Sequence, residues 1–155
     1  MRLIAILFTN LILTTLHLSG QNEPIIVEAE LGTLGADYQI LTDGDVTYIA
    51  PQTNFINTTN PGSTDKVATF TVNFADSGTY KLYARIRIGS NSFDDDSYYY
   101  GNDFGEKNPS QDNDWIICNN LASAGYSIID DVVEDQGDAA TEIWKWVAFS
   151  DFTGY

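Results

Sequence analysis

Strict alternation of apolar and polar residues over positions 80–88 constrains the fold of this 155-residue chain more than any other feature. Successive side chains of a strand point to opposite faces, so the pattern predicts a strand with one buried and one solvated face. The apolar positions are Tyr80, Leu82, Ala84, Ile86 and Ile88. A polar loop and three acids follow, and the aromatic run at 97–100 predicts another strand. This order is typical of an antiparallel β-domain.

Short strand-like runs separated by turn residues continue through the chain. The segments Asp43-Gly44-Asp45 and Asp76-Ser77-Gly78 are turn signals that predict hairpins between the strands beside them. No helix longer than a turn or two is convincing after the N-terminal segment, so the sequence predicts an all-β antiparallel β-sandwich. The other expected strands cover residues 24–30, 38–41, 46–49, 67–74, 114–119, 126–129 and 143–149.

The N-terminal segment, from Met1 to Gly20, has the pattern of a secretory signal peptide. Arg2 precedes an apolar stretch that is short for a membrane span, and Gly20 ends the segment with a small residue. An uncleaved membrane anchor is the alternative. In either case we expect a secreted or cell-surface protein whose single folded domain covers positions 21–155.

Acidic residues greatly outnumber basic ones. The net charge of −15 becomes −16 after loss of Arg2, with six Lys and Arg against 22 Asp and Glu. Such a surface repels phosphate backbones and anionic lipids, so nucleic acid and membrane surfaces are not expected partners. The acidity permits Ca²⁺ binding, although solubility explains it equally well.

The histidine and cysteine content excludes several kinds of active site. His17 is the only histidine and lies in the signal segment, so the mature chain has none for a catalytic triad, a Cys–His pair or a histidine zinc site. Cys118 is the only cysteine, which excludes an intramolecular disulfide. Its place in a strand-like run favours a buried apolar role over a reactive thiol.

Three stretches together resemble the secreted carbohydrate-binding modules of families 6 and 35, which are jelly-roll β-sandwiches of the galactose-binding-like superfamily. The resemblance covers positions 27–155. The matching pieces are VEAELGTLG, then GTYKLYARIRI with FDDDSYYY, then DWIICNNL with WKWVAF. Such modules continue with further strands, whereas this chain ends at Tyr155, so we expect the sandwich to lack its last strand or strands and to belong to a longer protein.

The resemblance implies a structural calcium ion bound by the two glutamates of its Glu-Ala-Glu motif, Glu28 and Glu30. Hard cations prefer several carboxylate and carbonyl oxygens on a rigid backbone. In the expected strand at 24–30, both glutamates share one face. The alternative is that they are two solvent-facing side chains without a metal.

The resemblance also implies a sugar site between aromatic rings. Tyr48 matches one aromatic wall, and Trp144 is our choice for the other. Trp146 shares the strand face of Trp144, and we expect at least one of the two to be buried. Asp96, between Asp95 and Ser97, corresponds to a loop segment in which we favour a loop-fixing hydrogen bond over direct sugar contact.

These features predict a non-catalytic module that binds polysaccharide or oligosaccharide, tethered to a glycan-degrading catalytic domain in a larger protein. One alternative is that the chain is part of a glycoside hydrolase or polysaccharide lyase, since glycoside cleavage requires only two carboxylates beside a cleft. The abundant acids, however, lie in surface loops without an evident tyrosine or arginine constellation. The other alternative is a structural or adhesion β-sandwich without a sugar ligand.

Overall fold

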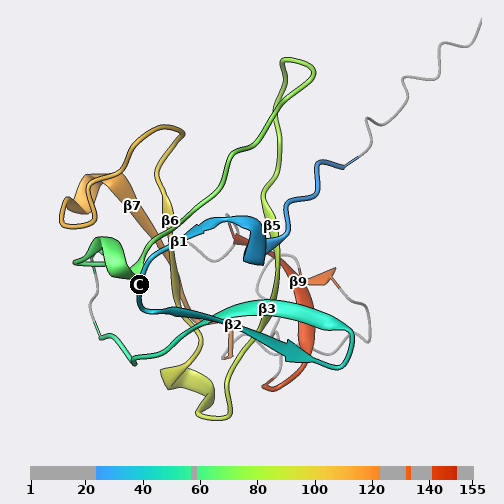
Figure 1. Ribbon diagram of the computed structural model, residues 1–155, viewed down its shortest axis with the longest axis vertical. Coiled ribbons are helices and arrows are strands. Elements are labelled where there is room, and N and C mark those ends of the chain that lie inside the picture. The colour runs from blue at the N-terminus through green and yellow to red at the C-terminus, as the bar shows by residue number, and fades with distance from the viewer. Residues whose placement is uncertain (1–23, 57–58, 123–131, 134–140, 150–155) are drawn as a thin grey trace, which may run out of the picture.

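The computed structural model describes residues 24–56, 59–122, 132–133 and 141–149. Within these ranges the chain forms short strands and 3-10 turns, without an α-helix (Figure 1). The fold is therefore all-β, as the alternation predicts. No helix in the described ranges is long and apolar enough to cross a membrane. The predicted signal segment and the predicted strand at 126–129 lie outside the described residues.

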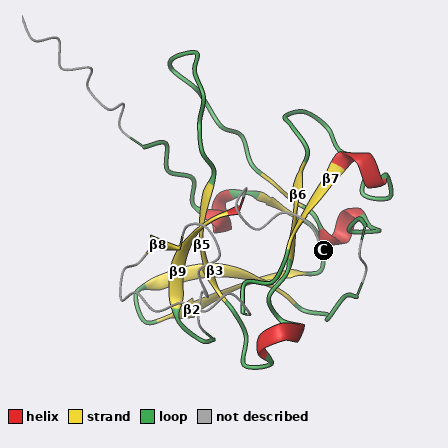
Figure 2. Cartoon of the chain, turned by 180° about the vertical axis from the view of Figure 1, so that it is seen from behind, coloured by secondary structure: helices red, strands yellow, loops and turns green. Residues whose placement is uncertain are grey.

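The hairpin predicted at Asp43-Gly44-Asp45 is confirmed. Strand β2 (Tyr38–Asp43) pairs antiparallel with β3 (Val46–Pro51) along its whole length. Gly44 has a positive φ of 59°. Glycine adopts this left-handed conformation without the steric cost of a Cβ atom. The turn therefore forms from local chemistry alone, and the hairpin crosses the β5–β9 region in both views of the molecule (Figures 1 and 2).

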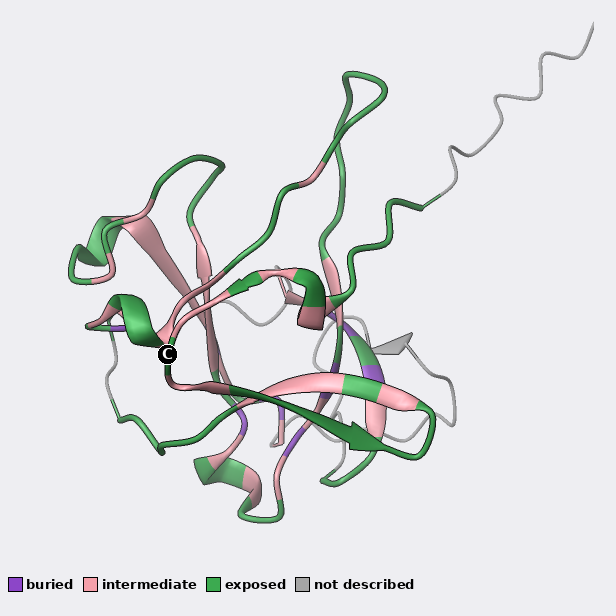
Figure 3. Cartoon of the chain, viewed as in Figure 1, coloured by how far each residue is buried: buried purple, intermediate pink, exposed green. Residues whose placement is uncertain are grey.

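The hairpin predicted at Asp76-Ser77-Gly78 is wrong. Strand β4 covers only Ala68–Thr69 and pairs with β1 (Thr33–Leu34). Strand β5 (Tyr83–Arg87) instead pairs antiparallel with β9 (Trp144–Ala148), which also pairs in parallel with β8 (Val132–Val133). Neighbours in sequence pair in most sheets but not in all, and here burial against distant segments determines the pairing. Residues 70–82 form a long excursion that is mostly exposed (Figure 3).

The predicted buried face of residues 80–88 is confirmed in its second half only. Ile86 and Ile88 are buried and Ala84 is half-buried, whereas Tyr80 and Leu82 are 44% and 54% exposed. The alternation therefore predicts burial correctly only in the part of the segment that pairs with β9. Before Tyr83, no strand of the described part of the chain pairs with it, and the same alternation buries little surface.

The core lies where β5, β9 and the β6–β7 pair meet. The aromatic run forms β6 (Tyr98–Gly101), which pairs antiparallel with β7 (Trp115–Cys118), and the strands predicted at both places are confirmed. Cys118 is fully buried, as predicted, and burial raises its pKa to about 12, with Asp96 adding to the shift. The buried apolar cluster consists of Ile86, Ile88, Cys118, Leu121 and Val147.

The strand predicted at 24–30 is wrong. Residues 24–28 have no strand assignment, and the chain then turns through the 3-10 segment η1 (Ala29–Leu31). Gly35 follows at a point where the chain passes very close to another backbone. A Cβ atom at this position would collide with the carbonyl oxygens of Thr64 and Asp65, so only glycine fits. The other 3-10 segments are η2 (Thr64–Lys66), η3 (Ser92–Asp94) and η4 (Asp112–Asp114).

Strand β9 keeps the alternation predicted for it, with one unexpected result. Lys145 and Val147 are buried on one side, while Trp144 is half-buried and Trp146 is 39% exposed on the other. The expectation that at least one of these two tryptophans is buried is therefore wrong. The core side of β9 takes the smaller side chains, and the long aliphatic stem of lysine can cover apolar surface.

Candidate functional site

Tyr48 and Trp144, the two predicted aromatic walls, lie against each other. They come from β3 and β9, and their ring centroids are 5.0 Å apart with the planes at 66°. This is the edge-to-face arrangement that aromatic pairs prefer. Both residues are half-buried. A sugar ring does not fit between rings in contact, so this arrangement presents one aromatic surface in place of two facing walls.

A hydrogen bond fixes the orientation of the Trp144 indole. Its Nε1–H donates to Oδ2 of Asp43 at 2.9 Å, which connects β9 to the last residue of β2. The Arg85 guanidinium lies 6.0 Å from the Trp144 ring centroid. This distance is within the range of a cation–π contact. The Trp144 side chain is therefore contacted by Asp43 of β2, Tyr48 of β3 and Arg85 of β5.

Arg87 lies between two carboxylates at the edge of this site. Its Nε is 3.7 Å from Asp43 Oδ2, and its second terminal nitrogen is 3.7 Å from Glu142 Oε1. Both distances exceed hydrogen-bond length, and the Nε atom is buried without a hydrogen-bond partner. Glu142 has a positive φ of 60°. Such a φ is uncommon for a residue with a side chain. The Glu142 amide donates to the Ile88 carbonyl at 2.8 Å, which holds the residue in this conformation.

Sequence reasoning missed Asp43, Arg87 and Glu142 as parts of the site. The sequence places Asp43 in a turn, Glu142 in an acidic loop and Arg87 on a solvated strand face. Their contacts join segments far apart in the chain, and no local spacing signals such an arrangement. The alternation of β5 does place Arg85 and Arg87 on one face, which is the only signal available from the sequence.

Trp146 provides the most accessible indole of the site. It is two residues from Trp144 on the same face of β9 and is 39% exposed. In the β5–β9 register it lies opposite Arg85, while Trp144 lies opposite Arg87. The sequence left open which tryptophan faces a ligand, and the structure leaves Trp146 as the one with free surface.

Asp96 fixes a loop and makes no contact with the aromatic pair. It is 3% exposed, and its Oδ2 accepts a hydrogen bond from the backbone N–H of Ala122 at 3.0 Å. Burial raises the pKa of Asp96, with a smaller contribution from the charges of Asp94 and Asp95. Among the described residues, no hydrogen bond or ion pair joins Asp96 to Tyr48 or Trp144. This geometry suits the loop-fixing role.

The two predicted calcium ligands differ in their surroundings. Glu28 is exposed and lines a groove of about 340 Å³ between the N-terminal segment and residues 69–71, whereas Glu30 is half-buried. The Oε2 atom of Glu30 is buried without a hydrogen-bond partner, which is uncommon for a buried polar atom. Within the described ranges, no group of three acidic, histidine or cysteine side chains gathers around it.

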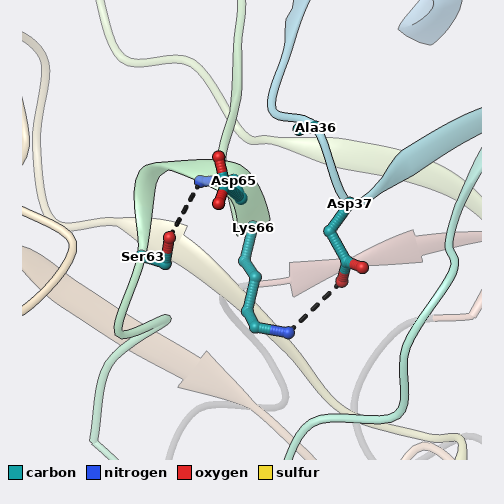
Figure 4. A pocket seen from close by; sticks show the side chains of 5 residues that line it. All are labelled: Ala36, Asp37, Ser63, Asp65 and Lys66. Atoms are coloured by element: carbon teal, nitrogen blue, oxygen red, sulfur yellow. Dashed lines mark hydrogen bonds and ion pairs between the residues drawn. The ribbon is translucent and has the colours of Figure 1, made fainter.

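A second polar depression, of about 410 Å³, lies where η2 meets the start of β2 (Figure 4). Lys66 Nζ is 3.3 Å from Asp37 Oδ2 and 2.9 Å from Thr53 Oγ1. The hydrogen bond from Thr53 lowers the pKa of Asp37, and Lys66 lowers it further. These groups satisfy one another, so the depression is best explained as a structural connection between η2 and β2.

Comparisons of the chain with protein-family models, with curated proteins and with solved structures found no significant match.

Proposed function

We propose that this chain is a non-catalytic, secreted module that binds polysaccharide or oligosaccharide, as the N-terminal part of a larger glycan-degrading protein. The observation that carries the proposal is the exposed Trp146 ring beside the Tyr48–Trp144 pair, with charged side chains at its edges. Aromatic rings bind the apolar face of a pyranose, and charged or polar groups bind its hydroxyls. The resemblance to carbohydrate-binding modules and the signal-like N-terminus support the same function.

The chemistry of the site sets the expected affinity. An exposed indole and a few hydrogen bonds suit micromolar to millimolar binding, which corresponds to about 4–8 kcal/mol. Tethering to a catalytic domain makes such weak binding useful because it raises the effective concentration of the substrate. We assign no catalytic step to this chain.

The proposal extends to a jelly-roll sandwich and a structural calcium ion. The small sheets of the all-β chain are compatible with two layers, and the unpartnered Glu30 Oε2 supports a cation beside η1. Calcium would connect the N-terminal segment to the domain and would not take part in binding sugar. Added Ca²⁺ should then raise the melting temperature, and Glu30→Gln should abolish that increase; an equal increase in the variant would refute the site.

Calorimetry and affinity gel electrophoresis against a panel of plant and algal polysaccharides test the proposed binding. At least one polysaccharide should retard the protein, and Trp146→Ala should abolish the retardation. Phe93→Ala is a matched control because Phe93 is also exposed but lies on η3. Absence of retardation by every polysaccharide, measured on the full-length protein, would refute the function.

A structural or adhesion domain is the second candidate, and one observation favours it. The Tyr48 and Trp144 rings are in contact, so this pair could serve packing alone. In that case no polysaccharide would retard the protein, Trp144→Ala would lower stability, and Trp146→Ala would leave stability unchanged. Retardation by a polysaccharide that Trp146→Ala abolishes therefore separates the two candidates.

A further inference from the structure

An exposed aromatic cluster lies between the segment after β4 and the loop after β6. The Phe74 ring centroid is 4.6 Å from that of Tyr80 and 5.3 Å from that of Phe104. The three side chains are 38%, 44% and 76% exposed, respectively. We call them the Phe–Tyr–Phe cluster. Within the described part of the chain, no ring contact joins this cluster to Tyr48 or Trp144, so the candidate sugar site does not account for it.

Local hydrogen bonds hold the cluster in this arrangement. The Tyr80 hydroxyl donates to the Asp76 carbonyl oxygen at 2.8 Å. The Phe104 N–H donates to Asp103 Oδ1 at 2.8 Å, and the Lys107 ammonium donates to the Phe104 carbonyl oxygen at 3.3 Å. The rings are therefore already ordered at the surface, which lowers the cost of ordering them when a partner binds.

Residues 70–82 extend the exposed apolar surface around the cluster. Phe70, Val72 and Phe74 alternate with polar residues, yet none of the described strands pairs with this segment. The segment projects from the body of the molecule (Figures 1 and 3). Together with Phe70 and Leu82, the cluster exposes on the order of 500 Å² of side-chain surface. An apolar patch of this size often marks an interaction site.

The charge around the patch favours a second copy of this chain as the partner. With a net charge of −15, two copies repel each other over most of their surfaces. Residues 70–82, however, contain one acid, Asp76, and one base, Lys81, so the segment carries no net charge. A basic partner would be attracted to the acidic surface elsewhere, whereas a partner as acidic as this chain can approach only where the surface is neutral.

We propose that the Phe–Tyr–Phe cluster and residues 70–82 form the contact of a symmetric homodimer. A two-fold axis brings the same patch of both subunits together, so apolar surface meets apolar surface. Two patches of this size bury about 1,000 Å² in total, which is typical of weak and transient complexes. The dimer should therefore form at micromolar to millimolar protein concentration.

Sedimentation velocity at protein concentrations between about 1 µM and about 1 mM tests the inference. The mean sedimentation coefficient should rise from that of a monomer toward that of a dimer, and more so in high salt, because salt screens the repulsion between the two acidic copies. Phe104→Ser removes the most exposed ring and should weaken the dimer about tenfold or more. Phe93→Ser is the matched control, since Phe93 is 68% exposed but lies on η3, and it should leave the dimer unchanged.

A second variant keeps every ring in place. Thr79 is exposed within residues 70–82, and Thr79→Asp should weaken the dimer in low salt, because a two-fold contact places the two new charges near each other. Ser90→Asp, at an exposed position before η3, should have no such effect. Far-UV circular dichroism should show that every variant folds.

Three results would overturn the inference. A protein that remains monomeric at every concentration would refute the dimer. Equal effects of Phe104→Ser and Phe93→Ser would place the dimer contact on another surface. A monomer whose sedimentation is shifted by oligolysine, with the shift lost in Phe104→Ser, would assign the patch to a basic partner. None of these measurements includes a glycan, so each result is independent of the proposed glycan binding.

Discussion

Replacement of Asp96 by alanine should destabilise the domain measurably. The substitution removes the acceptor that satisfies the backbone N–H of Ala122 at 3.0 Å. Loss of a partly buried hydrogen bond to a charged group costs about 1.5–3 kcal/mol. Part of this cost is offset because the variant no longer buries a carboxylate. We therefore expect a net loss of about 1–2 kcal/mol in the free energy of unfolding, or roughly 3–8 °C in melting temperature.

The pH dependence of the same residue has a definite sign. Burial raises the pKa of Asp96 above its usual value of 3.8, so the folded state binds the proton more readily than the unfolded state. As the pH falls from the raised pKa of the folded state to the usual pKa of the unfolded state, the contribution of Asp96 to the free energy of unfolding must therefore increase. Asp96→Asn keeps an oxygen acceptor but does not titrate. Wild-type protein should therefore gain stability relative to Asp96→Asn as the pH falls through this window.

Urea and thermal unfolding, followed by near-UV circular dichroism at several pH values, measure both effects. Asp94→Ala is the matched control, because Asp94 belongs to the same acidic run and is exposed. It should change the free energy of unfolding by less than about 0.5 kcal/mol. An Asp96→Ala melting temperature equal to that of wild type would show that the Ala122 hydrogen bond does not stabilise the loop. A difference between wild type and Asp96→Asn that is independent of pH would contradict the raised pKa.

Three further predictions concern the core, the thiol and the hairpin turn. Ile88 is fully buried, so Ile88→Ala should cost about 2–5 kcal/mol in urea unfolding. Ile56 is 89% exposed, and Ile56→Ala should change stability by only about 0.5 kcal/mol or less. Cys118 should not react with a thiol reagent at neutral pH until the protein unfolds, since burial raises its pKa to about 12; rapid labelling of the folded protein would contradict its burial. Gly44 has a positive φ and Gly78 does not. Gly44→Ala should therefore cost about 1 to about 2 kcal/mol in thermal unfolding, and Gly78→Ala should be nearly neutral.

The parts of the fold that sequence predicts correctly are those set by local chemistry. The β2–β3 hairpin follows from a glycine turn between two apolar runs, and β6, β7 and β9 follow from runs of aromatic and β-branched residues. The hairpin at Asp76-Ser77-Gly78 carried an equally good local signal and did not form. A turn signal indicates that the two segments beside it can pair, but it does not indicate whether another strand is a better partner for one of them.

The candidate site shows the same division. The resemblance implied Tyr48 and Trp144 as the two walls of a sugar site, and the structure brings these residues together from β3 and β9. It did not predict that the rings touch, because that distance depends on how the hairpin packs against the sheet. For Asp96 the sequence favoured a loop-fixing hydrogen bond over sugar contact, since a short acidic side chain before a strand commonly accepts a hydrogen bond from the backbone. The structure shows such a bond from the Ala122 N–H.

The sequence by itself determined that this chain is all-β, that its single cysteine is buried, that Arg85 and Arg87 share one face of β5 and that Trp144 and Trp146 share one face of β9. These properties follow from periodicity and composition, which act on each segment independently. Only the tertiary structure decided that β5 pairs with β9, because strand pairing depends on the burial that distant segments provide to one another. That pairing places Arg85 opposite Trp146 and Arg87 opposite Trp144, and it thereby creates the surface on which the proposed ligand binds.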